Sequence, residues 1–445
     1  MSSHRRADSA RQCASRYTIY SRYISLLQSN CQEARANSIR AQAIEGFDEG
    51  DRTDHSLFLR LMHDQLALYQ EQQNDTAVGD IYSIVIGKFR RIFGPKHWKT
   101  ITVIHEYGQI LCGAKRYEQA EALYRTFVHE VDEDHGPDSV PVLCIFNALG
   151  TVYAGRRKLK EAETILSRAL VGFERQTGEK DSRTLIAAFN LAGVYQDRGK
   201  LSHAIHMYQV AAYGFKDVMC LSYSTTITAF TQLAALCSAR RVAPEAKRAY
   251  ISALQGLEEA ARQDSIDALI LKLDLGILHR DEQRLDDTEQ LLKEVCQRLQ
   301  EARSGYAPGA LTCLGTVYAR QGRVAEAETS FADAAREFSE HDEQFSVMSY
   351  ATSFNLGLLL RSQRRLAEAE AMYRQVWDGA RSVGGLKHAA ACTIAEALGS
   401  LCEEQGKYEE AEEVYDQILA SDGVCLDRWT SFVMCTNFNK MTVFS

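Results

Sequence analysis

The stretch Leu-Gly-Thr-Val-Tyr at 149–153, followed by Glu-Ala-Glu at 161–163, decides the fold of this chain. The leucine and the tyrosine are four residues apart and share one helix face, and Gly150 leaves a gap where another backbone can lie close. Ala162 is small enough for a second helix to pack there, and we expect Glu163 to point to water. The stretch therefore predicts an antiparallel helix pair.

The same unit recurs along the chain. Small residues equivalent to Ala162 follow one another at intervals of 42, 42, 42, 42, 39, 42 and 42: Ala120, Ala162, Ala204, Ala246, Thr288, Ala327, Ala369 and Ala411. Twelve residues before each stands Gly108, Gly150, Ala192, Ala234, Gly276, Gly315, Gly357 or Gly399. Linker glycines at 94, 136 and 178 keep the same spacing and suit left-handed helix caps. A fixed period of this kind indicates a repeat array, because one helix pair cannot cover its own apolar edge.

The pattern resembles the tetratricopeptide repeat (TPR), whose unit of about 34 residues carries Leu-Gly, then Tyr, then Ala, then an aromatic residue. The longer period and the Gly-Pro-Lys-His-Trp-Lys-Thr stretch at 94–100 are similar to kinesin-light-chain-type repeats, as in fungal TPR proteins. This resemblance implies an all-α fold, a right-handed superhelical solenoid of antiparallel helix pairs.

We expect three segments along the chain. Residues 55–422 form one array of about nine units, and residues 55–99 are a degenerate first unit. Residues 1–54 are a flexible segment followed by a helical cap. Residues 423–445 are an apolar tail that could cover the last unit, occupy the groove or bind a partner, and we favour the first role. The 39-residue step predicts an irregular joint near residues 300–310, where two halves of the array would open separately.

Composition narrows the functional classes. The chain has 445 residues, with 51 basic against 59 acidic side chains, and shows no basic stripe of the kind that binds nucleic acid. Without a run of about 18 apolar residues, it predicts no membrane span. Twelve cysteines include no pair at zinc-binding or redox spacing, which favours reduced thiols in the cytoplasm. A mitochondrial location is the alternative, since the first 30 residues hold five arginines and one acid.

Motifs for chemistry are not evident. His203 and His206 are three residues apart, but the sequence nearby offers no carboxylate or thiol that would complete a metal site. Gly87-Lys88 lacks the upstream glycine of a phosphate loop, and Ser400 lacks the second glycine of a nucleophile elbow. We therefore expect no enzyme, no cofactor and no metal.

The resemblance to TPR proteins implies a concave groove lined by the first helix of each unit. The candidate groove residues carried over from it are His105, Asn147, Thr151, Phe189, Asn190, Gln232, Phe354 and Asn355. Amide side chains can bond the backbone of an extended peptide, and phenylalanine rings offer apolar contacts. The alternative is that Asn190 and Asn355 only orient helices.

We call the glycine or alanine that stands twelve residues before each repeated small residue the packing glycine. Four rows of groove positions lie six, three and two residues before it and one residue after it. These rows contain no lysine or arginine. Because a carboxylate clamp needs charge-assisted donors, binding of the acidic C-terminal peptide of a chaperone is disfavoured. We predict a non-enzymatic scaffold or adaptor that binds a peptide or helix of a partner protein whose identity the sequence does not specify. The alternatives are a regulatory or sensor array acting in trans with a signalling ATPase, and an accessory scaffold for pathway enzymes.

Overall fold

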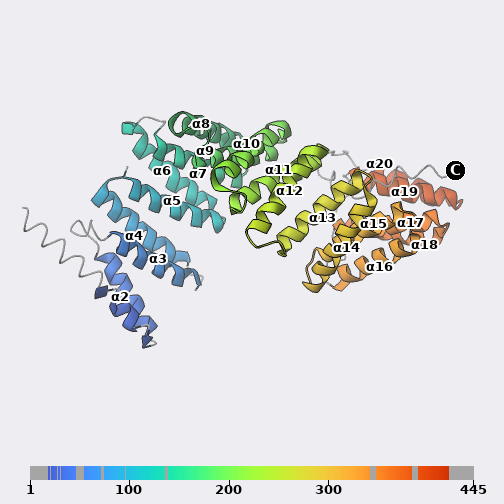
Figure 1. The fold of residues 1–445 in the computed structure, drawn as a ribbon, viewed down its shortest axis with the longest axis horizontal. Coiled ribbons are helices and arrows are strands. Elements are labelled where there is room, and N and C mark those ends of the chain that lie inside the picture. Colours follow the sequence, from blue (N-terminus) through green and yellow to red (C-terminus); the bar gives the residue numbers. More distant parts are fainter. Residues whose placement is uncertain are drawn as a thin grey trace, which may run out of the picture. The chain divides into compact units, whose positions relative to one another are not determined.

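The computed structural model describes residues 19–20, 22–27, 29–30, 32–46, 55–71, 75–95, 97–135, 139–340, 347–382 and 389–419. These residues form helices and contain no strand, which confirms the all-α prediction (Figure 1). The apolar tail at 423–445 and the arginine-rich start of the chain lie outside the described residues, so the roles expected for them stay predictions.

The chain divides into two compact units, Met1–Gly214 and Phe215–Ser445. The first unit contains α2 (Glu33–Glu45), α3 (His55–Glu71), α4 (Asp75–Phe93), α5 (Trp98–Gly113), α6 (Tyr117–His135), α7 (Val140–Gly155), α8 (Leu159–Thr177), α9 (Ser182–Asp197) and most of α10 (Leu201–Met219). The second contains α11 (Ser224–Ala239), α12 (Ala243–Glu259), α13 (Ile266–Asp281), α14 (Leu285–Glu301), α15 (Ala307–Arg320), α16 (Val324–Glu340), α17 (Val347–Ser362), α18 (Leu366–Ser382), α19 (Ala389–Glu404) and α20 (Tyr408–Leu419).

Within each unit the helices stack as the repeat pattern predicts. Each helix contacts the next, as α7 does with α8 in the first unit and α13 with α14 in the second. The first helices of successive repeats, here called A helices, also contact one another, as α7 does with α9 and α15 with α17. Both units are therefore TPR-like helical solenoids, in which contacts join neighbouring repeats.

The glycines of the repeat pack against large side chains of the second helix, whereas the sequence predicted a close approach of its backbone at Ala162. A Cβ atom placed on Gly150 would lie 2.4 Å from Cγ of Leu166 on the second helix of its own repeat. A Cβ on Gly315 would lie 2.8 Å from the ring of Phe331 in the same arrangement. Both partners are fully buried, at 0% exposure, so glycine at these positions sets the distance between the two helices.

Left-handed residues end the helices at the same period as the packing pattern. The turn inside each repeat holds one residue with positive φ: Lys115, Arg157, Gly199, Arg241, Gln283, Gly322, Arg364 and Gly406. Between repeats, Gly94 and Gly178 have φ of 93° and 90°, a region that favours glycine, but Gly178 has ψ of 164° and so does not adopt the left-handed cap conformation expected there. Gly136 lies outside the described residues. Cys220 takes the equivalent position with φ of 88°, where a side chain is strained.

The joint near residues 300–310, expected to be irregular, is well packed. Leu299, Ala307 and Ala310 belong to one buried core cluster that joins α13 to α16. That core is intact across the shorter step, and α15 has 14 residues where α13 has 16. The expectation of irregular packing here is wrong, and separate opening at this joint stays a prediction; the boundary between the compact units falls at Gly214.

Candidate binding face

The A helices α5, α7 and α9 carry five of the eight candidate groove residues. His105 lies on α5, Asn147 and Thr151 on α7, and Phe189 and Asn190 on α9. Since α5 contacts α7 and α7 contacts α9, these residues share one face of the first unit, which we call the inner face. The other three lie in the second unit, Gln232 on α11 and Phe354 and Asn355 on α17.

Two of the candidate amides meet across neighbouring repeats. The Nδ2 atom of Asn190 donates a hydrogen bond to Oδ1 of Asn147 at 3.0 Å, and both side chains are half-buried. An asparagine side chain has two donor hydrogens and an accepting oxygen. The pair therefore keeps donor capacity on Asn147 and an acceptor on Asn190 for a further bond.

The neighbours of this amide pair are held in place by local contacts. The half-buried ring of Phe189 packs edge-on against Tyr208, with ring centroids 5.5 Å apart. Thr151 is exposed and its hydroxyl donates to the carbonyl oxygen of Ala148 at 2.7 Å. Burial lowers the pKa of His105, which favours the neutral ring, although the charge of Glu106 opposes this.

In the second unit, two candidates are in the core. Phe354 is 3% exposed and packs against Tyr373, and Asn355 is 0% exposed. The neighbouring A helix α15, which contacts α17, is likewise buried over nearly its whole length. Phe354 and Asn355 therefore line no open surface in this structure, whereas Gln232 is half-buried.

Sequence reasoning missed two arginines that reach the inner side of the second unit. Arg361 donates to Oγ of Ser400 at 3.1 Å, and Arg280 donates to Oγ1 of Thr316 at 3.4 Å. Both arginines stand four residues after the packing glycine, a position that is not among the four groove rows. A step of three residues from the row just after the packing glycine would have found them, because residues i and i+3 share a helix face.

Glu163 does not point freely to water, as its position beside Ala162 suggested. Its carboxylate forms ion pairs with Arg198 and, at 2.8 Å, with Lys200 of the next repeat. Burial alone would raise the pKa of Glu163, but the hydrogen bond from Lys200 and the charge of Arg198 outweigh it and lower the pKa. The side chain is part of a packed contact between repeats, because 19% of it is exposed.

Four more glutamates repeat this contact, and we call the set the carboxylate ladder. Each follows the small residue of its repeat and bonds a basic residue 34 to 37 positions later: Glu121, Glu163, Glu289, Glu328 and Glu370. The ladder is interrupted where Ile205 and Lys247 stand at the same repeat position. The basic residues of the turns recur at the same period as the small residues, because each ladder glutamate pairs with one of them.

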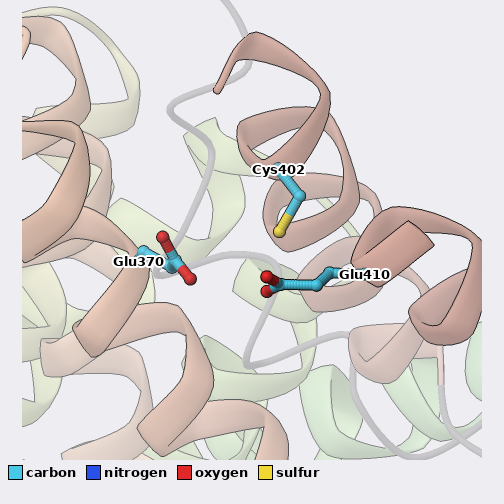
Figure 2. Close-up of side chains that lie close together, drawn as sticks. All are labelled: Glu370, Cys402 and Glu410. Atoms are coloured by element: carbon cyan, nitrogen blue, oxygen red, sulfur yellow. The ribbon is translucent and has the colours of Figure 1, made fainter. Parts of the chain in front are cut away.

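One rung of the ladder also resembles a metal site. Ligand atoms of Glu370, Cys402 and Glu410 lie within 4.8 Å of one another (Figure 2). Lys407 and Arg374 already bind the carboxylate of Glu370 at 2.7 Å and 2.8 Å. Burial, with the charge of Glu370, raises the pKa of the Cys402 thiol. A metal ion would need the thiolate of Cys402, and the ammonium of Lys407 would compete with the ion for the carboxylate of Glu370. This donor set therefore does not suit a metal ion.

Family models match three parts of the chain. One tetratricopeptide-repeat model matches residues 141–212 and 349–422, and another matches residues 314–382. The chain contains tetratricopeptide repeats. No helix among the described residues is long and apolar enough to span a bilayer.

Solved structures that resemble this chain are distant from it in sequence. The apo form of RapI is 13% identical, with a TM-score of 0.60 over 82% of this chain and 98% of that one. The apo form of the quorum sensor NprR from B. thuringiensis is 16% identical, with a TM-score of 0.52 over 81% and 97%. TPR-like repeats of a putative kinesin light chain from Podosopora anserina are 14% identical, with a TM-score of 0.41 over 45% and 95%. No curated protein matches the sequence of this TPR chain.

Proposed function

We propose that this TPR chain is a non-enzymatic scaffold or adaptor, and that the inner face of α5, α7 and α9 binds an extended segment of a partner protein. The observation that carries this proposal is the amide pair formed by Asn147 and Asn190. TPR repeats generally serve as interaction scaffolds, which agrees with this assignment. Groove binding itself goes beyond that general role.

The amide pair suits the main chain of a peptide. Asn147 and Asn190 belong to successive repeats, so a segment that crosses the A helices meets both side chains. An extended backbone offers a carbonyl acceptor and an N–H donor, which match the donor left on Asn147 and the acceptor left on Asn190. Phe189 adds an apolar contact beside them, and its packing on Tyr208 keeps it in place before binding, which reduces the entropy lost.

Two other functions would use the same inner face. A regulatory or sensor array would act in trans with a signalling ATPase, and an accessory scaffold would hold pathway enzymes. NprR, which shares the fold, is named a quorum sensor, and this makes the regulatory function the first alternative. The eight cysteines of the described residues are free thiols, which supports the cytoplasm as the proposed compartment.

The test begins with affinity purification of the full chain and mass spectrometry of the proteins that it retains. The affinity of a purified partner segment is then measured for the wild type, the Asn147→Ala/Asn190→Ala double variant and Gln176→Ala. Gln176 is a matched control, because it is an exposed amide on α8, the second helix of a repeat. The double variant should bind about 5-fold to 150-fold more weakly, since each of the two hydrogen bonds contributes about 0.5–1.5 kcal/mol.

Equal affinity of the double variant and the wild type would place the partner on another surface. Loss of affinity in Gln176→Ala alone would place the partner on the second helices of the repeats, such as α8. The identity of the partner, whether cargo, ATPase or pathway enzyme, distinguishes the three functions.

A further inference from the structure

A cavity opens on the inner face at the first repeats. It has a volume of about 410 Å³ and lies between α3, α4 and α5. Leu66, Tyr82 and Ile110 form its apolar side, and His63, Glu106 and Gln109 form its polar side. Glu106 and Gln109 stand two residues before and one after the packing glycine Gly108, so the cavity belongs to the same rows as the amide pair.

The polar side of the cavity holds an accessible carboxylate. Oε2 of Glu106 lies 3.3 Å from Nε2 of His63, and the two side chains are 33% and 52% exposed. Burial, together with the charge of Glu106, raises the pKa of Tyr82, whose ring stacks on Tyr107 at 4.8 Å. The cavity thus combines a fixed, uncharged aromatic wall with one negative charge that solvent can reach.

The chemistry of the lining selects the kind of group that fits. An anion would be repelled by Glu106, and a zinc ion would find only His63 and Glu106 where it needs three or four ligands. A purely apolar group would bury the carboxylate with His63 as its one side-chain partner and offer no charge to balance it, which is unfavourable. A long side chain with a cationic end satisfies both sides, because its stem is apolar and its head group is charged.

The other groove rows of the inner face carry no positive charge that would repel a cation. Glu106 is the only charged residue in the four groove rows of α5, α7 and α9: Thr102, Cys144, Ile186, His105, Asn147, Phe189, Glu106, Ala148, Asn190, Gln109, Thr151 and Gly193. A cationic group at the cavity therefore meets one opposite charge and no like charge from these rows. Charge-assisted hydrogen bonds to a carboxylate are among the stronger polar contacts in proteins.

We propose that this cavity receives a lysine or arginine side chain of the partner segment, with its head group on Glu106 and its stem against Leu66 and Ile110. This proposal rests on the proposed function and specifies the chemistry of the partner: an extended segment with a basic residue at the end that lies over α3 and α5.

Saturation-transfer NMR on the full chain tests the cavity without any partner. The probes are the N-acetyl N-methylamides of lysine and arginine, and the comparison compounds are those of norleucine and glutamate. The side-chain signals of lysine and arginine should be at least fivefold stronger than those of norleucine, and glutamate should give none. Glu106→Gln, an isosteric change at a partly exposed position, should reduce the lysine signal at least fivefold.

Glu396→Gln is the matched control, because Glu396 is an exposed carboxylate in a groove row of the second unit. It should leave the lysine signal unchanged. Gln109→Glu adds a second carboxylate to the cavity and should strengthen lysine binding at least twofold, which keeps the test valid if Glu106→Gln does not fold. Equal signals for lysine and norleucine, or for wild type and Glu106→Gln, would overturn the cation site.

The outcomes for the cavity and for the amide pair can be separated. Absence of lysine binding, with partner affinity still dependent on Asn147 and Asn190, would reject the cavity and keep the groove. Lysine binding at Glu106, with partner affinity independent of the amide pair, would do the reverse.

Discussion

Three glycines inside A helices should respond differently to alanine. An ideal Cβ would lie 2.4 Å from Leu166 at Gly150, 3.0 Å from Leu292 at Gly276 and 3.6 Å from the hydroxyl of Tyr208 at Gly193. Alanine gains about 1 kcal/mol over glycine in a helix interior. Any difference among the three sites therefore reports how tightly the second helix packs against the first.

The net effect follows from the distance at each site. Gly193→Ala makes only an ordinary contact, so it should stabilise its repeat by about 1 kcal/mol. At Gly150 the clash is with the branched end of a fully buried Leu166, and overpacking costs about 1–3 kcal/mol. Gly150→Ala should therefore destabilise by about 1 kcal/mol after the helix gain, and Gly276→Ala should fall near zero.

Hydrogen exchange read by mass spectrometry is the appropriate assay, because a repeat array need not unfold in one step. The opening free energies of α7–α8, α9–α10 and α13–α14 are compared between each variant and the wild type. Thermal melting followed by circular dichroism gives a second measure. Equal stabilisation by Gly150→Ala and Gly193→Ala would refute the close contact between Gly150 and Leu166.

Two further predictions follow from the turns and from the ladder. Cys220→Gly should raise stability by about 1 kcal/mol by relieving the strained φ of 88°, whereas the helical control Cys112→Gly should lower the melting temperature; a lower melting temperature for both would contradict this. Hydrogen bonds from Lys293 and Arg323 lower the pKa of Glu289 to about 2, so its contribution is complete above the unfolded pKa of about 4.3 and is lost as pH falls towards 2. Glu289→Gln should flatten the fall in melting temperature between about pH 5 and pH 2, and unchanged slopes would show that this rung contributes nothing.

The sequence by itself determined the helix pairs and their register. Helical spacing and the period of small residues are local properties, so a second helix could be placed against Gly150 from the sequence, whereas the structure shows that Leu166 is the side chain that meets it. The positive φ of Gly178 followed from the same repeat. Likewise, the rows that hold Asn147 and Asn190 follow from counting residues around the packing glycine.

Only the tertiary structure decided which positions in a row are open. Asn190 and Asn355 have the same place in the repeat, yet Asn190 is half-buried and Asn355 is 0% exposed. Glu163 was expected in water and instead binds Arg198 and Lys200 of the next repeat. The pairing of His63 with Glu106 joins residues 43 positions apart. The exposure and the partners of a residue depend on how neighbouring helices pack over it. That packing is set by the stacking of repeats, which a local sequence period does not specify.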